Sequence, residues 1–291
     1  MKKPWFFIMV CVLPAFLLVA YTIIWSSVQV FYQSFTNSTV LMINEPVFVG
    51  LANFRTMFSD SHFWAAFWNT ARLVLVAPLI TIAIALILAF MVTQSKLRER
   101  GFYRTVYFFP SIISIAVIGI VWSFIFHPTR GVLNEVLAVA GFPAFKEEGF
   151  AWLANPDTAI WAIAVAFIWQ SAGYFMVMHI AAIDSIPTET FEAATIDGAG
   201  GVRKLTSIAL PLIRNIVGIT FIFSLSGILD SSFALSRIMT PRGQAEVLLS
   251  YAYTQGFTNA QYGYGMAITA FTLVIAIIFA GLSRFITSRD G

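Results

Sequence analysis

Charged residues are scarce in this chain, and cysteine is almost absent. Asp, Glu, Lys and Arg make up 11% of the 291 residues, whereas a soluble domain contains about 25%. Hydrophobic residues reach 59%, so a chain of this composition has more apolar surface than a soluble fold can bury. Cys11 is the single cysteine, which excludes an internal disulfide and leaves the redox compartment undetermined. The composition therefore indicates an integral membrane protein.

The sequence also lacks the patterns of a metal site, a nucleotide site and a nucleic-acid surface. His62, His127 and His179 are far apart and have no metal-ligand spacing, so no metal site is expected. The glycine-rich run at 198–206 lacks the order of a P-loop and follows no strand, so we do not expect this chain to hydrolyse ATP. Basic residues are dispersed along the chain, which argues against nucleic-acid binding.

Six apolar stretches are long enough to cross a bilayer. A helix rises about 1.5 Å per residue, so about 20 residues span the hydrocarbon layer. The sequence predicts an all-α membrane protein with a single transmembrane domain over residues 1–291. The expected spans are residues 5–25, 73–92, 106–126, 159–180, 212–229 and 265–285.

The distribution of Lys and Arg predicts the orientation, because cytoplasmic segments retain positive charge. With the N-terminus inside, eleven of the 17 basic residues fall on the cytoplasmic side: Lys2, Lys3, Lys96, Arg98, Arg100, Arg104, Arg203, Lys204, Arg214, Arg284 and Arg289. The other six fall outside: Arg55, Arg72, Arg130, Lys146, Arg237 and Arg242. Both termini are thus predicted to be cytoplasmic. The first apolar run is too long for a signal peptide and lacks a processing site, which favours an uncleaved helix.

The loops differ in character. The outer segment 50–69 has aromatic residues at near-helical spacing and predicts a short interfacial helix, which serves either as a packing cap or as a docking site. The outer segment 127–155 predicts an irregular loop around one short helix. The inner loop 184–211 predicts a helix after Pro187 capped by Thr188, a turn at Gly198, Gly200 and Gly201, and a second helix from about Val202.

This inner loop resembles the EAA loop of ABC importer permeases. The anchor positions that match are Glu192, Ala193, Ala194, Gly198, Ile208, Leu210 and Pro211. Residues 101–126 and 50–70 are also similar to carbohydrate permeases related to the maltose importer. The resemblance implies the six-span type I importer permease fold in the cytoplasmic membrane of a prokaryote.

The resemblance also implies partners. The EAA loop would be a coupling helix held in a cleft of a cytoplasmic ATPase subunit, with Glu192 facing a basic residue and Ala193 and Ala194 allowing close approach. A second permease subunit, most simply a paralogue, two ATPase subunits and an extracytoplasmic solute-binding protein complete such a machine. ATP and Mg²⁺ would be used by the ATPase subunits, and no cofactor is expected in this chain.

A solute path is predicted between the fourth and fifth spans, since polar side chains within a bilayer face the bundle interior or a water-filled cavity. Helical spacing places Gln170, Ser171 and Tyr174 on one side of the fourth span. The fifth span contributes Ser224 and Ser231, with Asp230 adjacent at its outer end, and the resemblance adds Ser111 on the third span. Amide, phenol and hydroxyl groups suit a hydroxyl-rich solute.

Three functions remain open at this stage. The first is import of a sugar or oligosaccharide, and the second is import of another solute, such as a glycerol phosphate ester, by the same machinery. The third is an integral membrane enzyme or ion-driven carrier. This last is disfavoured because the spans are uncharged apart from Asp230 and Arg72 near their outer ends.

The charge distribution generates a topology prediction. A reporter fused after Lys204 is expected to be cytoplasmic, and one fused near Glu147 external, because positive charge is retained inside. Paired alkaline phosphatase and green fluorescent protein fusions measure this directly. The reverse pair of signals would overturn the orientation.

Overall fold

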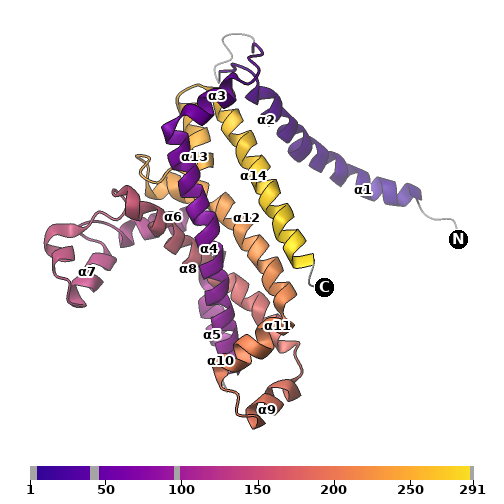
Figure 1. Ribbon diagram of the computed structural model, residues 1–291, viewed down its shortest axis with the longest axis vertical. Coiled ribbons are helices and arrows are strands. Elements are labelled where there is room, and N and C mark those ends of the chain that lie inside the picture. The colour runs from indigo at the N-terminus through magenta and orange to yellow at the C-terminus, as the bar shows by residue number, and fades with distance from the viewer. Residues whose placement is uncertain (1–4, 40–45, 95–98, 289–291) are drawn as a thin grey trace. The chain divides into compact units, whose positions relative to one another are not determined.

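The computed structural model describes residues 5–39, 46–94 and 99–288, and this part of the chain forms helices and no β-strand (Figure 1). Its α-helices are α1 (Trp5–Val19), α2 (Ser26–Ser34), α3 (Ala52–Ser59), α4 (Ser61–Gln94), α5 (Arg100–Phe108), α6 (Ile115–Ile125), α7 (Val132–Val139), α8 (Pro156–Asp184), α9 (Thr188–Ile196), α10 (Gly201–Lys204), α11 (Leu210–Leu212), α12 (Arg214–Met239), α13 (Leu248–Tyr253) and α14 (Tyr262–Ser288). Shorter π or 3-10 turns are η1 (Ala20–Trp25), η2 (Phe109–Ile112), η3 (Phe145–Gly149), η4 (Leu205–Ala209) and η5 (Thr254–Thr258). Of the basic residues used for orientation, Lys2, Lys3, Lys96, Arg98 and Arg289 lie outside the described residues.

Four helical stretches of the described chain are long and apolar enough to cross a membrane, and each overlaps a predicted span. They are Met9–Ser34, Ser61–Gln94, Pro156–Asp184 and Arg214–Met239. The last predicted span falls within α14, where Tyr262–Ile278 forms a shorter apolar helix. The architecture is that of an all-α protein with several membrane-spanning helices.

The third predicted span, 106–126, is not one straight helix. Arg100–Ile112 and Ile115–Ile125 meet at an angle of 97°. Pro110 cannot donate a backbone hydrogen bond, so the helix tightens into the 3-10 turn η2 and then ends. Ile113 and Ser114 are extended, and the Ser114 carbonyl accepts the Ile118 N–H to begin α6. The expected continuous helix was wrong at this point because a long apolar run predicts burial and length but no direction.

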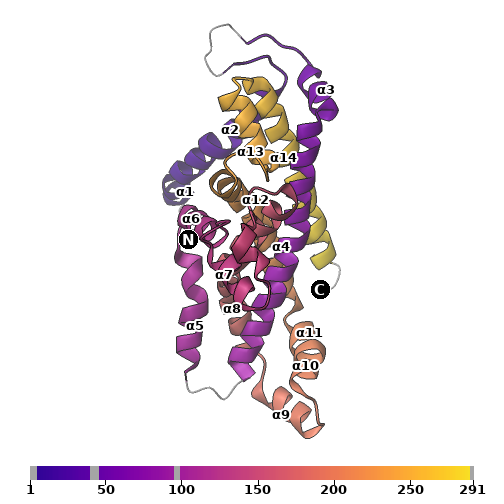
Figure 2. The same ribbon diagram turned by 90° about the vertical axis from the view of Figure 1, so that its left-hand side faces the viewer.

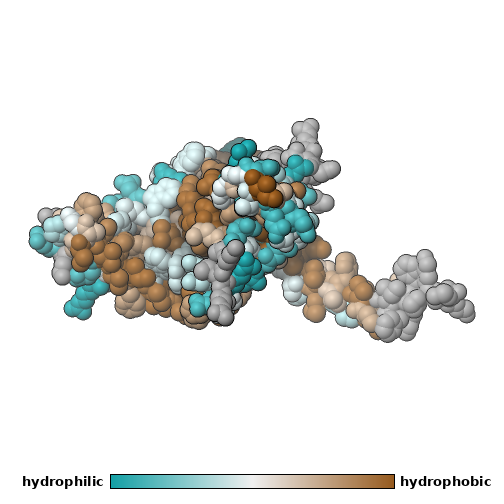
Figure 3. Space-filling view, turned by 90° about the horizontal axis from the view of Figure 1, so that it is seen from below, coloured by the Kyte–Doolittle hydropathy of each residue, from teal (hydrophilic) through white to brown (hydrophobic). Residues whose placement is uncertain are grey.

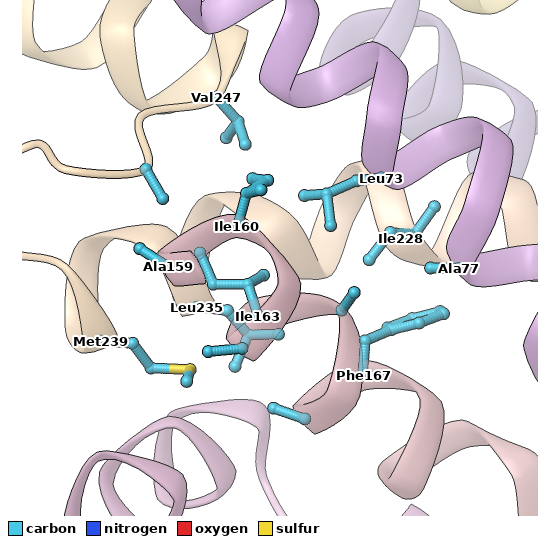
Figure 4. Packing of buried hydrophobic residues seen from close by; sticks show 14 of the residues in the cluster. Leu73, Ala77, Ala159, Ile160, Ile163, Phe167, Ile228, Leu235, Met239 and Val247 are labelled. Atoms are coloured by element: carbon cyan, nitrogen blue, oxygen red, sulfur yellow. The ribbon is translucent and has the colours of Figure 1, made fainter. Parts of the chain in front are cut away.

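The chain separates into two compact units, residues 1–64 with 251–275, and residues 65–250 with 276–291. In the larger unit, α8 packs against α4, α6 and α12 around an aliphatic core (Figure 4). The side chains labelled in that view are Leu73, Ala77, Ala159, Ile160, Ile163, Phe167, Ile228, Leu235, Met239 and Val247. Because lipid is as apolar as these side chains, the core stabilises the bundle through close packing more than through escape from the solvent.

A second cluster of buried side chains lies toward the end of α8 that leads into α9. It joins α4, α8, α9 and the η4–α12 region through Phe90, Phe175, Met176, Ile183, Phe191, Ala209 and Ile213. Figures 1 and 2 both show α9 beyond the ends of α4, α5 and α8. The predicted loop helix is therefore packed onto the bundle by its own side chains.

In the smaller unit, Asp60 ties the start of α4 to α13 and α14. The hydroxyls of Tyr251 and Tyr264 donate to Asp60 Oδ2 at 2.5 and 2.6 Å, and the His62 N–H donates to Oδ1 at 2.9 Å. Burial favours the protonated acid, but the phenols and the N–H groups of His62 and Phe63 outweigh it and hold the pKa of Asp60 below its usual value. This ionised carboxylate both caps α4 and links three helices.

The approach of α5 to α8 requires a glycine. A Cβ on Gly173 of α8 would lie 1.7 Å from the Tyr107 carbonyl oxygen and 3.0 Å from the Phe108 Cα. Both neighbours are backbone atoms, so neither can rotate away. The two helices therefore make contact through main chain at this level.

We expect Gly173→Ala to force α5 away from α8 and to destabilise the folded protein by about 2 kcal/mol or more. Gly101→Ala is the matched control, because a Cβ there meets no atom within 4 Å and alanine favours a helix. Thermal midpoints of the two variants in detergent, followed by fluorescence-detected size exclusion, report the difference. Equal midpoints would contradict the close contact.

Candidate functional site

A cavity of about 300 Å³ opens between η2, α8 and α12. Its lining residues are Ser111, Phe167, Gln170, Ser171, Tyr174, Phe175, Phe223, Gly227 and Ser231. Five of the seven predicted path residues are among them: Ser111, Gln170, Ser171, Tyr174 and Ser231. The structure thus brings together residues that are 120 positions apart in sequence, because α8 and α12 pack side by side and the break after η2 delivers Ser111 to the same space.

Two of the serines already use their hydroxyl hydrogens inside the protein. Ser111 Oγ donates to the Phe108 carbonyl at 2.6 Å, and Ser171 Oγ donates to Gln170 Oε1 at 3.0 Å. The Tyr174 ring lies 5.2 Å from that of Phe175 and remains 46% exposed. The cavity therefore combines fixed polar atoms with aromatic faces, and none of its nine lining residues is charged.

Ser224 and Asp230 do not line the cavity. Ser224 is completely buried, and its hydroxyl has no hydrogen-bond partner among the described residues. It shares a face of α12 with Gly227 and Ser231 and follows Thr220 by about one turn; Thr220 Oγ1 is 2.9 Å from His179 Nε2 of α8. Helices α8 and α12 are in side-chain contact at Thr220, and Ser224 is itself covered by protein atoms. Asp230 is exposed and is not among the residues that line the cavity.

Sequence reasoning missed the aromatic walls Phe167, Phe175 and Phe223. Phenylalanine is so frequent in this chain, with 29 residues, that composition alone does not single out any one of them. The helical spacing held a usable signal, since Phe167 precedes Gln170 by three positions and Ser171 by four. Extending the polar face formed by Gln170, Ser171 and Tyr174 by one helical turn toward the start of α8 would have included Phe167.

The inner loop forms the predicted helical hairpin. Helix α9 ends at Ile196, and Gly198 follows with φ = 76°, the left-handed conformation that glycine adopts without strain. Thr188 is the first residue of α9 and makes no capping bond, so its expected capping role was wrong; Pro187 stands at that position instead. Lys204 Nζ donates to Thr195 Oγ1 at 2.7 Å and closes the hairpin.

The motif residues divide between two faces of the hairpin. Glu192, Ala193, Gly198 and Pro211 are exposed, whereas Ala194 is buried and Ile208 and Leu210 pack against the cluster that contains Phe191. Ala194 thus faces its own protein, and the expected close approach of a partner falls to Ala193 alone.

Two apolar side chains near the turn were not predicted as functional. Ile196 is 88% exposed and Val202 is 79% exposed. Figure 3, which views the molecule from the α9 end, shows hydrophobic residues beside hydrophilic ones on this surface. The hairpin therefore presents a carboxylate, a small residue and two exposed apolar side chains away from the bundle.

A comparison with known families decides the affiliation of the chain. Residues 81–289 match the family of the binding-protein-dependent transport system inner membrane component. The chain belongs to this family. The matched region contains α8, α9 and α12, and hence both the cavity-lining helices and the hairpin.

Relatives of this inner membrane component are named as permeases. The diacetylchitobiose uptake system permease protein NgcF of Streptomyces coelicolor is 34% identical over 256 residues, which are 84% of this chain and 72% of NgcF. The sn-glycerol-3-phosphate transport system permease protein UgpA of Escherichia coli is 31% identical over 250 residues, 83% of this chain and 81% of UgpA. The chain is accordingly a transport subunit and not an enzyme.

A solved structure shares the fold of this permease. One chain of a bacterial alginate ABC transporter, crystallised with its alginate pentasaccharide-bound periplasmic protein, superposes with a TM-score of 0.82. The alignment covers 98% of this chain and 95% of that chain at 22% sequence identity. The all-α fold of the chain is therefore shared with that transporter chain.

The hairpin generates a prediction for Gly198. A Cβ there would meet no atom within 4 Å, so the cost of Gly198→Val is backbone strain of about 1–2 kcal/mol or more. We expect solute uptake by the complete transport system to fall about fivefold or more while the amount of permease in the membrane is unchanged. Gly198→Asn should keep more activity, since asparagine tolerates positive φ.

Gly201→Ala is the control for this prediction, because Gly201 begins α10 with open space around it and no positive φ. Uptake by that variant should stay near the wild-type rate. Normal uptake by Gly198→Val would show that transport does not depend on the conformation of this turn.

Proposed function

We propose that this chain is one permease subunit of an ATP-driven importer that moves a sugar or oligosaccharide into the cytoplasm, delivered by an extracytoplasmic binding protein. The cavity between η2, α8 and α12 carries the proposal. It offers an amide, a phenol and three hydroxyls beside aromatic rings, which are the groups that recognise a hydroxyl-bearing ring. NgcF is named for diacetylchitobiose uptake, which agrees with this chemistry.

The chemistry of the cavity favours a neutral solute over a phosphate ester. A glycerol phosphate carries a negative charge that a low-dielectric site pairs with Arg, Lys or several backbone N–H groups. The nine lining residues contain no basic side chain. Glycerol phosphate remains the alternative because UgpA is a relative of similar identity, and a phosphate-binding group contributed by a partner subunit would be needed.

The proposed chain forms a single transmembrane domain with six spans and both termini in the cytoplasm. Four long apolar helices, the bent α5–α6 pair and α14 support that number. The domain would reside in the cytoplasmic membrane of a prokaryote. It pairs with a second permease, most simply a paralogue, and with two ATPase subunits that use ATP and Mg²⁺.

In this assembly α9 is the coupling helix. The exposed surface of the hairpin, with Glu192, Ala193 and Ile196 of α9 and Val202 of α10, would rest in the cleft of an ATPase subunit. Its buried residue Phe191 packs into the cluster shared by α4 and α8. A displacement of α9 by the ATPase would thus be transmitted to those helices through packed side chains, which are stiff at protein packing density.

The solute assignment is tested with Tyr174→Ala and Ser231→Ala in the assembled transporter. Loss of one stacking or hydrogen-bonding partner weakens binding by about 1 kcal/mol, so we expect the solute concentration for half-maximal uptake to rise about fivefold or more in each variant. Stimulation of ATP hydrolysis by the loaded binding protein should persist. A panel of labelled mono-, di- and trisaccharides and glycerol 3-phosphate identifies the solute in the wild type.

Ser226→Ala is the matched control, because Ser226 is an exposed residue of α12 that does not line the cavity. Its uptake should equal that of the wild type. Unchanged uptake by both cavity variants would move the solute contacts to the partner permease, and preferential uptake of glycerol 3-phosphate would refute the sugar assignment.

A further inference from the structure

An ion pair joins α5 to the last residue of α8. Arg104 Nη2 lies 2.9 Å from Asp184 Oδ2, and the two side chains are 38% and 47% exposed. Asp184 is followed directly by Ser185, Ile186 and Pro187, the linker to α9. The pair therefore connects α5 to the junction at which the coupling hairpin leaves the bundle.

The Arg104 side chain is partly covered by the protein. Its Nε atom is buried and has no hydrogen-bond partner among the described residues. The preceding Tyr103 packs on the cluster that contains Phe175 and Met176 of α8. Asp184 thus pairs with a guanidinium that is partly covered by protein and that extends from a residue next to a packed position of α5.

Helix α5 also contacts α8 at its C-terminal end, about one turn beyond Arg104. The backbone of Tyr107 and Phe108 fits against Gly173, where no side chain separates the helices. Helices α5 and α8 are therefore attached at two levels, one ionic at the α9 end and one by main-chain contact near the cavity. Two separated attachments make one helix follow both translation and tilt of the other.

The segment that follows α5 is the cavity wall. Only η2 and the break at Ile113 and Ser114 lie between α5 and α6, and Ser111 of η2 lines the cavity. The 97° bend means that an axial shift of α5 displaces η2 across the end of α6 instead of sliding both pieces together. Movement at the α8–α9 junction can in this way change the position of Ser111.

We propose that Arg104 and Asp184 are a positioning pair, which makes α5 follow the α8–α9 junction and so conveys movement of the hairpin to the Ser111 wall of the cavity. This proposal rests on the importer function above and adds a second route beside the packing of Phe191. The pair touches neither solute nor nucleotide. Its role is to set how far the Ser111 wall of the cavity is displaced when α9 moves.

The test uses proteoliposomes that contain the full transporter, with the loaded binding protein on the extracytoplasmic side of the permease. It measures the ratio of sugar transported to ATP hydrolysed. The probe is the labelled saccharide of the panel that the wild type imports best. Arg104→Ala and Asp184→Ala should each lower the ratio about fivefold, the lower range of an intersite coupling. ATP hydrolysis stimulated by the binding protein should continue.

Two further variants separate a pairing effect from loss of a single residue. The charge swap Arg104→Asp with Asp184→Arg should restore the ratio to within about twofold of the wild type, and the double alanine variant should be no worse than either single one, because paired residues are not additive. Arg214→Ala removes an exposed positive charge at the start of α12 and should leave the ratio unchanged.

Each outcome decides a separate point. A wild-type ratio in both single alanine variants, or no rescue by the swap when the swapped protein is present at wild-type level in the vesicles, would overturn the positioning pair alone. Failure of the wild-type transporter to import any saccharide of the panel with ATP would overturn the proposed function, and the pair's role in sugar coupling with it.

Discussion

Lipid provides no hydrogen-bonding partner, and this constraint determines where the chain is able to leave a helix. Along the long helices the backbone satisfies itself, and hydroxyls such as those of Thr81, Thr93 and Thr220 donate to carbonyls of their own helix. Irregular backbone at membrane depth is tolerated where protein covers it or where it lines a cavity. The break after η2 meets both conditions, since α8 packs against η2 and Ser111 faces the cavity. The broken helix thus supplies part of the cavity wall, and the cavity and α8 together accommodate the irregular backbone.

The positions of the long helices followed from the lengths of the apolar runs, and the elements of the inner loop followed from its proline and glycine residues. In the inner loop, α9 spans Thr188–Ile196, in agreement with the helix expected after Pro187, and the glycine turn has the positive φ at Gly198 that its residue type suggested. The direction of the third span did not follow, although Pro110 was visible in the sequence. A proline in an apolar run permits either a kinked continuous helix or a break, and tertiary packing against α8 selects between them.

The cavity was predictable to the extent that helical periodicity governs it. Gln170, Ser171 and Tyr174 share a face at fixed spacing, so any partner packed beyond that face creates a common space. Ser224 shows where periodicity ends, because it has the right angle around α12 but lies one turn too far toward the contact between His179 and Thr220. Angle around a helix is encoded locally, whereas the depth at which two helices close together depends on all the side chains between them.

The internal hydrogen bonds of Ser111 and Ser171 give the cavity a polarity of its own. Each hydroxyl has one hydrogen, and both hydrogens are engaged by oxygens of the protein, so both serines present only lone pairs to an occupant. Donors must then come from the Gln170 amide nitrogen, the Tyr174 phenol and Ser231. A ring that brings O–H groups to the serines is matched there, while its O-methylated derivative would set oxygen against oxygen. For the proposed solute, the cavity would therefore discriminate by the direction in which a hydrogen bond points as well as by shape.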